Sequence, residues 1–413
     1  MANVPRMPRN RAFQRLWIGT AAANLADGIV LAAAPLLAAA ITHDPVLVSG
    51  LVVAQRVPWF AFTLLSGALV DRRDRRALLV AANVARACAL GVLAISLSAG
   101  VKSLPILYAT VFALGMAETI EDTAALAVLP AIVPREQLER ANAQIYTAQS
   151  LLNDLIGPPL GGVLFAVAAV AAFATGAAAF AVAGIALAAL PLARPAHQDA
   201  PIEPMLAAIG EGFRWFWGNR LIRIVALMSG AVNMFTFAAI GVLVLFAEQR
   251  LGLDARGYGL LIAGGAVGGV AGGLLADRLV RLLGSGPTIF LSNLLPGLAL
   301  VGLGATRSPA VAAAMLAVDS FTAMPAIVVV VTLRQAGVPD RLIGRVTSAY
   351  RMIAIGALPV GALLGGVLAR RFGLSAPFYA GGAALAVLAF ALLPVLTTSA
   401  IDRANGSLVE TKT

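Results

Sequence analysis

The chain has 413 residues, of which 60% are hydrophobic and only 12% are charged, and its mean hydropathy is +0.89. This composition lies far outside the range of soluble globular proteins and indicates a membrane protein with many spans. The net charge of +10 does not indicate a nucleic-acid partner, because the arginines cluster in short loops between apolar runs. The apolar runs are about 20 residues long, roughly twice the length of an outer-membrane barrel strand.

Twelve apolar runs follow one another along the chain. Each is long enough to cross a hydrocarbon core of about 30 Å as a helix. The first is too long for a signal peptide and is expected to be a retained span. We therefore expect an all-α membrane protein with twelve transmembrane helices in two pseudo-symmetric six-helix bundles. The predicted ranges are 16–41, 46–70, 77–99, 104–129, 141–167, 170–192, 221–247, 257–280, 287–305, 309–333, 343–369 and 374–397.

Positive charge is distributed unequally between the two sides of these spans. With the N-terminus inside, 21 of the 30 Lys and Arg fall in cytoplasmic segments, six fall outside and three lie within spans. Cytoplasmic loops carry an excess of Lys and Arg, so this ratio favours a multi-pass protein of the cell membrane with both termini in the cytoplasm.

The longest connection divides the chain into two halves of six spans. Residues 193–220 contain three prolines and then an aromatic-rich segment, which predicts a cytoplasmic linker with an amphipathic helix at the membrane surface. The predicted domains are an N-terminal bundle of residues 1–192 and a C-terminal bundle of residues 221–413 with a cytoplasmic tail.

The two halves also share sequence motifs at a nearly constant offset, which indicates an internal duplication, as in many secondary transporters. Residues 67–72 return as 273–278, residues 133–134 as 338–339, and residues 160–164 as 364–368, at offsets of 206, 205 and 204.

The loop between the second and third spans carries a pattern of glycine, aspartate and arginine. With the twelve helices and the repeat, this pattern resembles the major facilitator superfamily, whose motif Gly-x-x-x-Asp-Arg-x-Gly-Arg-Arg has Asp74 in place of its second glycine here. The resemblance implies a cytoplasmic gate that is latched by this loop and released in the inward-open state. The alternative is that these charges only set topology. The gate residues are Gly67, Asp71, Arg72, Arg75 and Arg76, with Asp277 and Arg278 in the repeat.

The fifth span carries a Gly-Pro-x-x-Gly-Gly sequence formed by Gly157, Pro158, Gly161 and Gly162. It resembles the core of the antiporter motif of drug/proton exporters, with Asn153 where the motif has an upstream glycine. The stretch AETIEDTAALAVLPAIVP, which begins in the fourth span, resembles the branch that contains the enterobactin exporter and macrolide efflux proteins, as do Phe13-Gln-Arg-Leu-Trp17 and Leu25-Ala-Asp27-Gly28. A bent helix with a glycine face can act as a hinge or a seal, and simple helix packing is the alternative.

Several ionisable side chains fall within the predicted spans. Each needs a partner, a proton or a water-filled cavity, because charge at membrane depth costs on the order of 3 kcal/mol. On the fourth span Glu118 is the strongest proton-site candidate, whereas Glu121 and Asp122 lie nearer the cytoplasmic end and are expected to be partly solvated. We expect proton coupling by these three acids and Asp27, unless they form a purely structural ion-pair network. The candidate charge partners are Arg56, Arg86, Asp154, Asp319 and Arg351. Asp319 and Arg351 are expected either to pair with each other or to contact substrate.

These features predict a proton-driven exporter of small amphipathic or lipophilic molecules, as in multidrug efflux, that works by alternating access. A dedicated exporter of a siderophore or another natural product is one alternative, and a non-transporting receptor or lipid scramblase is another. The expected partners are a small-molecule substrate, protons and membrane lipids, with no nucleic acid. We expect a monomer that is not an enzyme and uses no cofactor, metal site or catalytic residue. The substrate contacts proposed from the sequence are Trp59, Phe60, Phe112, Phe235 and Phe237.

Overall fold

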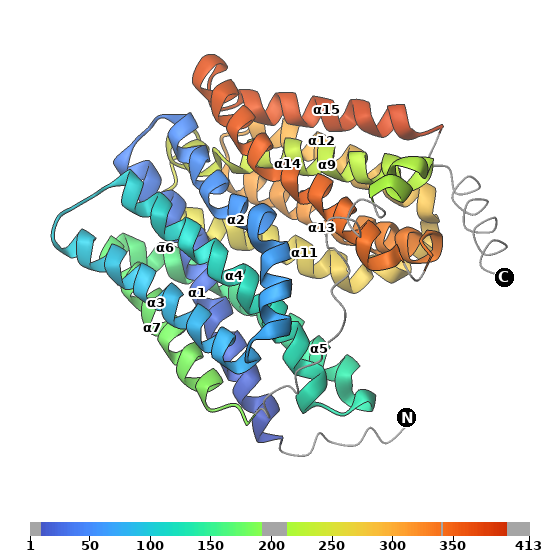
Figure 1. Cartoon of the computed structure of the whole chain (residues 1–413). Helices are drawn as coiled ribbons and strands as arrows, with labels where there is room; N and C mark the ends of the chain where they lie inside the picture. Colours follow the sequence, from blue (N-terminus) through green and yellow to red (C-terminus); the bar gives the residue numbers. More distant parts are fainter. Residues whose placement is uncertain (1–9, 192–212, 340–341, 395–413) are drawn as a thin grey trace. The chain divides into compact units, whose positions relative to one another are not determined.

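The computed structural model describes residues 10–191, 213–339 and 342–394, and all regular secondary structure in these ranges is helical (Figure 1). Ten of the twelve predicted spans are single helices. Their bounds are α1 Arg11–Ile41, α2 Pro45–Arg72, α3 Arg75–Ser98, α4 Leu104–Ile132, α7 Ala169–Ala188, α11 Ala255–Leu283, α12 Ser285–Ala305, α13 Pro309–Gly337, α14 Ile343–Phe372 and α15 Ala376–Leu392.

The other two predicted spans are subdivided. The fifth consists of the 3-10 turn η1 (Arg135–Gln137), α5 (Leu138–Gln149), the π-helical segment η2 (Ser150–Ile156) and α6 (Gly157–Val167). The seventh consists of α9 (Arg220–Ile240) and α10 (Leu243–Gln249).

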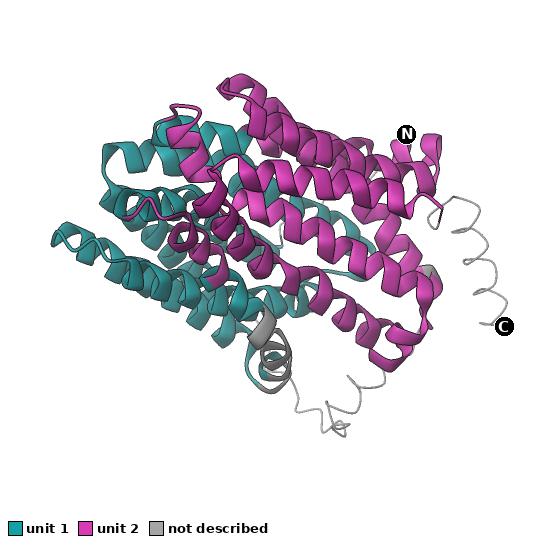
Figure 2. Ribbon diagram, turned by 90° about the horizontal axis from the view of Figure 1, so that it is seen from above, with its two compact units in different colours: residues 1–41, 54–199, 254–263 teal, residues 42–53, 200–253, 264–413 magenta. Residues whose placement is uncertain are grey.

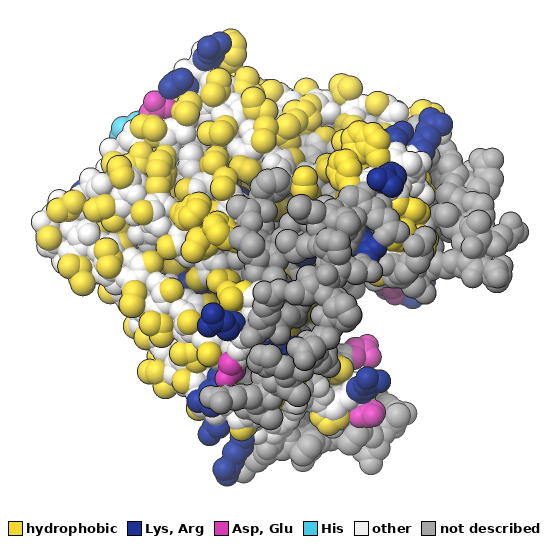
Figure 3. All heavy atoms as spheres, in the orientation of Figure 1, with side chains coloured by type: hydrophobic (Ala, Val, Ile, Leu, Met, Phe, Trp, Pro, Cys, Tyr) yellow, Lys and Arg dark blue, Asp and Glu magenta, His cyan; other side chains and the backbone are white. Residues whose placement is uncertain are grey.

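Length and hydropathy are sufficient for membrane crossing in ten stretches of the described residues. The 28-residue α2 and the shorter apolar α15 occupy the two remaining predicted ranges, which confirms the all-α, twelve-helix prediction. Figure 3 shows apolar side chains spread over the described surface of one face with few charges among them. Ile185 is 72% exposed and Leu274 is 81% exposed, as expected for side chains that face lipid.

The chain forms two compact units (Figure 2). Unit 1 contains residues 1–41, 54–199 and 254–263, and unit 2 contains residues 42–53, 200–253 and 264–413. In contrast to a single division at the central connection, the first residues of α2 belong to unit 2 and the first residues of α11 belong to unit 1. Most of the predicted linker lies outside the described residues.

In unit 1, α1 packs closely against α7. A Cβ added to Gly19 of α1 would lie 2.6 Å from Cγ of Leu187 on α7. Leu16, Leu79 and Val128, from α1, α3 and α4, join Leu187 in one buried apolar cluster. This cluster holds together the three helices that carry the ionisable groups described below.

In unit 2, Phe216 is fully buried and packs with α9 and α14 residues such as Ile222 and Val346. Phe216 belongs to the aromatic-rich segment that is expected at the membrane surface, and for this side chain the expectation is wrong. Its neighbours Phe213 and Trp217 are 39% and 49% exposed.

The internal repeat is visible in the geometry of equivalent positions. Val133 and Val338 end α4 and α13 in the same extended conformation, with φ and ψ of −123° and 131° in one case and −106° and 131° in the other. Gly162 of unit 1 packs against the backbone of Ala255 at the start of α11. Its repeat equivalent, Gly366, packs against Ser49 near the start of α2 in unit 2. In each unit, a glycine of the repeated motif therefore packs against the first turns of another helix, α11 in unit 1 and α2 in unit 2.

Candidate functional site

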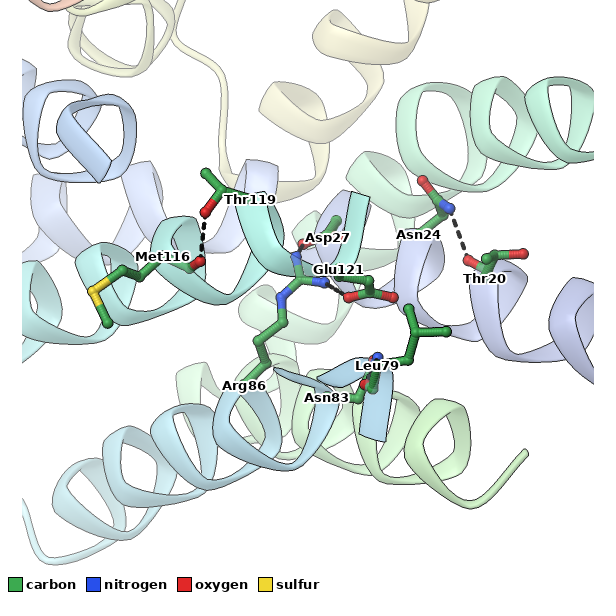
Figure 4. Close-up of polar contacts among 9 residues, drawn as sticks. All are labelled: Thr20, Asn24, Asp27, Leu79, Asn83, Arg86, Met116, Thr119 and Glu121. Atoms are coloured by element: carbon green, nitrogen blue, oxygen red, sulfur yellow. Dashed lines mark hydrogen bonds and ion pairs between the residues drawn. The ribbon is translucent and has the colours of Figure 1, made fainter. Parts of the chain in front are cut away.

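Three helices of unit 1 each contribute one charged side chain to a buried cluster (Figure 4). Arg86 of α3, which is 1% exposed, forms ion pairs with Asp27 of α1 and Glu121 of α4. Its Nη2 donates to Oδ1 of Asp27, and its Nη1 donates to Oε2 of Glu121 at 2.6 Å. We call these three residues the Arg86 cluster.

The rest of the Arg86 side chain is enclosed by the bundle. Its guanidinium carbon lies 4.2 Å from the centre of the Phe180 ring on α7, a distance at which a cation is attracted to an aromatic face. Nε of Arg86 is buried and has no hydrogen-bond partner among the described residues. One turn earlier, Asn83 donates to the carbonyl of Leu79 on its own helix, so that its amide does not reach the carboxylates.

The charges of the Arg86 cluster do not cancel when all three groups are ionised. One guanidinium faces two carboxylates, which leaves a net charge of −1. Glu118 lies near enough to add a further repulsion on Asp27. A single proton on one carboxylate makes the cluster neutral, which in a low-dielectric interior is a large change in electrostatic energy.

The three acids of α4 occupy different environments. Glu121 is buried at 5% exposure, so the expectation that it is partly solvated is wrong. Glu118 is half-buried and is not ion-paired with Arg86 in the described structure, and Asp122 is exposed. Its spacings of four and three from the buried Ala117 and Ala124 place Glu121 on the buried face of α4, which the nearly uniform apolar sequence of this helix does not single out.

The other candidate charges are not brought into the Arg86 cluster. Arg56 on α2 is half-buried, and its Nε has no partner among the described residues. Asp154 is half-buried within the π-helical η2. In unit 2, Asp319 is half-buried on α13 and Arg351 is exposed on α14. No ion pair joins Asp319 to Arg351 in the part of unit 2 that the structure describes.

The predicted gate loop lies at the junction of α2 and α3. Gly67, Asp71 and Arg72 belong to the last turns of α2, and the side chains of Asp71 and Arg72 are not described. Nη1 of Arg75 donates to the carbonyl of Ala127 on α4 at 3.0 Å, which ties the start of α3 to α4. Arg76 is exposed.

Asp74, which departs from the superfamily pattern, has a clear structural role. Its Oδ1 accepts hydrogen bonds from the backbone N–H groups of Arg76 and Ala77 at 2.9 and 3.4 Å, so it is the N-cap of α3. In the repeat, exposed Asp277 pairs with Arg281 on the same helix at 2.7 Å, and Arg278 is also exposed.

The glycines of the fifth span make very close backbone contacts. A Cβ on Gly157 would lie 2.5 Å from Cα of Gly28 on α1, and a Cβ on Gly161 would lie 2.4 Å from the carbonyl oxygen of Ile29. The N–H of Gly157 bonds to the carbonyl of Leu152, five residues earlier, which is a π-helical bond. Pro158 follows directly, so an irregular segment of helix packs beside Asp27.

The five aromatic residues predicted to contact substrate are distributed over both units. In unit 1, Trp59 is half-buried and Phe112 is 36% exposed, and the side chain of Phe60 is not described. Phe235 and Phe237 on α9 of unit 2 are half-buried. Their role as substrate contacts stays a prediction.

Comparison with known proteins identifies the family of this chain. The family model described as transmembrane secretion effector matches residues 6–408. Enterobactin exporter EntS of Shigella boydii serotype 4 (strain Sb227) is 26% identical over 399 residues, which cover 96% of this chain and 94% of the relative. The enterobactin exporter of Escherichia coli O1:K1 / APEC shows the same identity and coverage.

Solved structures with the same fold are membrane transporters. A POT family transporter in complex with 5-aminolevulinic acid has a TM-score of 0.77 at 11% identity, and the match covers 95% of this chain and 97% of that one. A bacterial homologue of the iron transporter ferroportin has a TM-score of 0.71 at 16% identity, with coverage of 97% and 100%. The predicted family and the prediction that the protein is not an enzyme are thereby confirmed. The chain belongs to the transmembrane secretion effector family of major facilitator superfamily transporters.

Proposed function

We propose that this protein is a secondary active exporter of small amphipathic or lipophilic molecules, driven by proton entry across the cell membrane. It works by alternating access as a monomer, surrounded by lipid, with both termini in the cytoplasm and no cofactor. The observation that carries the proposal is the Arg86 cluster, in which one buried guanidinium is shared by two carboxylates from different helices.

Proton binding to the Arg86 cluster has a mechanical consequence. When both acids are ionised, Arg86 holds α1 and α4 to α3 through charged hydrogen bonds, which are about twice as strong as neutral ones. A proton on either acid removes its charge and weakens its contact with Arg86. The packing of three helices in unit 1 therefore responds to one proton, as coupling between a proton gradient and a conformational change requires.

The two carboxylates differ in how readily a proton can reach them. The side chain of Asp27 is 26% exposed, whereas that of Glu121 is 7% exposed. We therefore assign Asp27 as the group that exchanges protons. Glu121 keeps Arg86 in place while Asp27 is protonated.

Transport in proteoliposomes tests the proposal. An imposed pH gradient should drive ethidium flux by the wild type, and Asp27→Asn should lower the gradient-driven component at least tenfold. Glu136→Gln is the matched control, because it removes the same charge from an exposed position in η1. Normal gradient-driven flux in both Asp27→Asn and Glu121→Gln would overturn the assignment of coupling to the Arg86 cluster.

A second candidate function is export of a siderophore. The observation in its favour is the similarity to enterobactin exporters over 96% of the chain. Flux of enterobactin that ethidium does not inhibit would favour a dedicated siderophore exporter over a multidrug pump. A receptor or lipid scramblase, by contrast, would show no flux of either compound that depends on the pH gradient.

A further inference from the structure

Asp319 is an acidic residue within the apolar helix α13 of unit 2. It lies ten residues from the start of the helix, which places it about 15 Å along the helix axis. Its side chain is half-buried, and its carboxylate has no hydrogen bond or ion pair with any residue that the structure describes. A carboxylate at this depth without a partner requires an explanation.

The polar groups nearest along α13 are directed to other atoms. The hydroxyl of Thr322 donates to the backbone carbonyls of Val318 and Asp319, at 3.1 and 2.9 Å. Ser320 lies on the face of α13 that packs against the glycines of α11, since its side chain is 3.7 Å from a Cβ added to Gly269. The carboxylate therefore receives no hydrogen bond from its own helix.

The basic side chains of neighbouring segments do not neutralise Asp319 either. Arg351 is exposed on α14, and the guanidinium of Arg334 lies over the ring of Tyr350 at 4.6 Å. The other described acids of unit 2, Asp44, Glu248 and Asp277, lie outside α13 at or near the ends of their helices.

Neither carboxylate oxygen of Asp319 is among the fully buried, unpartnered atoms of the described residues, unlike Oδ1 of Asn293. Ionisable groups within membrane spans face the bundle interior or a water-filled cavity, because contact with lipid is costly. A half-buried anionic group without a protein partner, on an otherwise apolar helix, suits a ligand that supplies both a positive charge and apolar surface.

We propose that Asp319 binds the positively charged group of the substrate, so that the exporter recognises lipophilic organic cations. The inference rests on the proposed export function and specifies its substrate class. The carboxylate neutralises the cation at membrane depth, and the apolar residues around it contact the rest of the molecule. Neutral substrates do not use this contact.

Binding of tetraphenylphosphonium to purified protein in detergent tests the proposal without requiring transport. Asp319→Asn should weaken binding at least tenfold, and Asp319→Glu should retain most of the affinity. Glu248→Gln is the control, because it removes one negative charge from an exposed position of the same unit. Unchanged affinity in a folded Asp319→Asn protein would overturn the proposal.

Two further measurements separate the competing explanations. In proteoliposomes, Asp319→Asn should reduce ethidium flux and leave flux of the neutral probe chloramphenicol unchanged. Loss of both fluxes with normal tetraphenylphosphonium binding would instead make Asp319 a proton site. Wild-type protein that binds tetraphenylphosphonium through Asp319 but shows no gradient-driven flux would refute the proposed function and leave this inference standing.

A test on the wild type covers the case in which Asp319 variants do not fold. Dicyclohexylcarbodiimide modifies carboxyl groups in apolar surroundings, and mass spectrometry locates the modified residue. Tetraphenylphosphonium should protect Asp319 and leave modification of Asp27 unchanged. Equal modification of Asp319 with and without the cation would contradict the proposal.

Discussion

Arg86 on α3 donates a hydrogen bond to Glu121 on α4 at 2.6 Å, and both side chains are buried. The acid closest to the guanidinium on α4 is thus not Glu118, the acid that lies nearest to mid-membrane by its position in the sequence. This distinction between two acids on one helix has a direct functional test.

Glu121→Gln should reduce gradient-driven transport more than Glu118→Gln. Glutamine keeps the size of Glu121 but removes the charge that holds Arg86, whereas Glu118 makes no ion pair with Arg86 in the described structure. Initial rates of ethidium flux in proteoliposomes, normalised to the amount of reconstituted protein, measure the difference. Equal losses in the two variants would show that the hydrogen bond to Arg86 does not determine which acid matters.

Replacing Arg86 by methionine should destabilise the protein strongly. Removal of one partner from a buried ion pair costs about 3–5 kcal/mol, because the remaining charge stays buried without compensation. Two carboxylates would then face each other across the site. The apparent unfolding temperature in detergent, followed by intrinsic fluorescence, reports the loss.

The same principle predicts a rescue. Adding Asp27→Asn and Glu121→Gln to Arg86→Met removes the uncompensated charges, and the triple variant should recover much of the lost stability while remaining unable to couple transport to protons. If the triple variant is as unstable as Arg86→Met alone, the loss comes from packing, for example against Phe180, and not from charge.

Gly28→Ala should destabilise unit 1 by about 1–3 kcal/mol, which is typical of overpacking. The new Cβ would lie 2.5 Å from the carbonyl oxygen of Asn153 and 2.8 Å from Cα of Gly157, and neither backbone atom can move freely. Gly91→Ala is the matched control, because nothing lies within 4 Å of a Cβ at that position in α3. Since alanine favours a helix over glycine by up to about 1 kcal/mol, Gly91→Ala should be neutral or stabilising. Equal unfolding temperatures for the two variants would contradict the close approach of α1 to the π-helical segment.

Asp44 in unit 2 combines a helix cap with a surface ion pair, and substitutions separate the two. Its Oδ1 accepts from the N–H of Val46 at 2.8 Å, and its Oδ2 lies 3.5 Å from Nη1 of Arg370. Asp44→Ala should cost about 1 kcal/mol, the usual value of an N-cap, and Asp44→Asn should cost less because it retains the cap. Arg370→Gln should have almost no effect, because exposed ion pairs contribute little. A large, salt-sensitive loss in Arg370→Gln would show that the ion pair dominates.

The fold could be predicted from the sequence because its signals are long and repeated. Apolar runs separated by charged turns located all twelve helices, and the paired motifs indicated two related halves. Irregularities within helices were not predictable in the same way. The π-helical segment lies directly before Pro158 and packs against Gly28 of α1, and a contact between helices cannot be predicted from the local sequence.

The candidate site was predictable as a set of charges but not as a set of contacts. Depth counted along each helix selected Asp27, Arg86 and Glu118, but it does not report which way a side chain faces. Rotation about the helix axis decides that Glu121 is buried and Asp122 is exposed. Similarly, comparison with the superfamily pattern showed Asp74 only in place of a glycine, whereas in the structure the side chain caps α3.

The order of the three charged helices along the chain also matters for biogenesis. Synthesis begins at the N-terminus, so α1 is available in the bilayer before Arg86 arrives on α3, and α4 follows immediately. Asp27 is therefore the first counter-ion that the nascent chain offers to Arg86, and Glu121 completes the neutralisation one helix later. An arginine that would resist membrane insertion alone thus enters after one carboxylate and directly before the other.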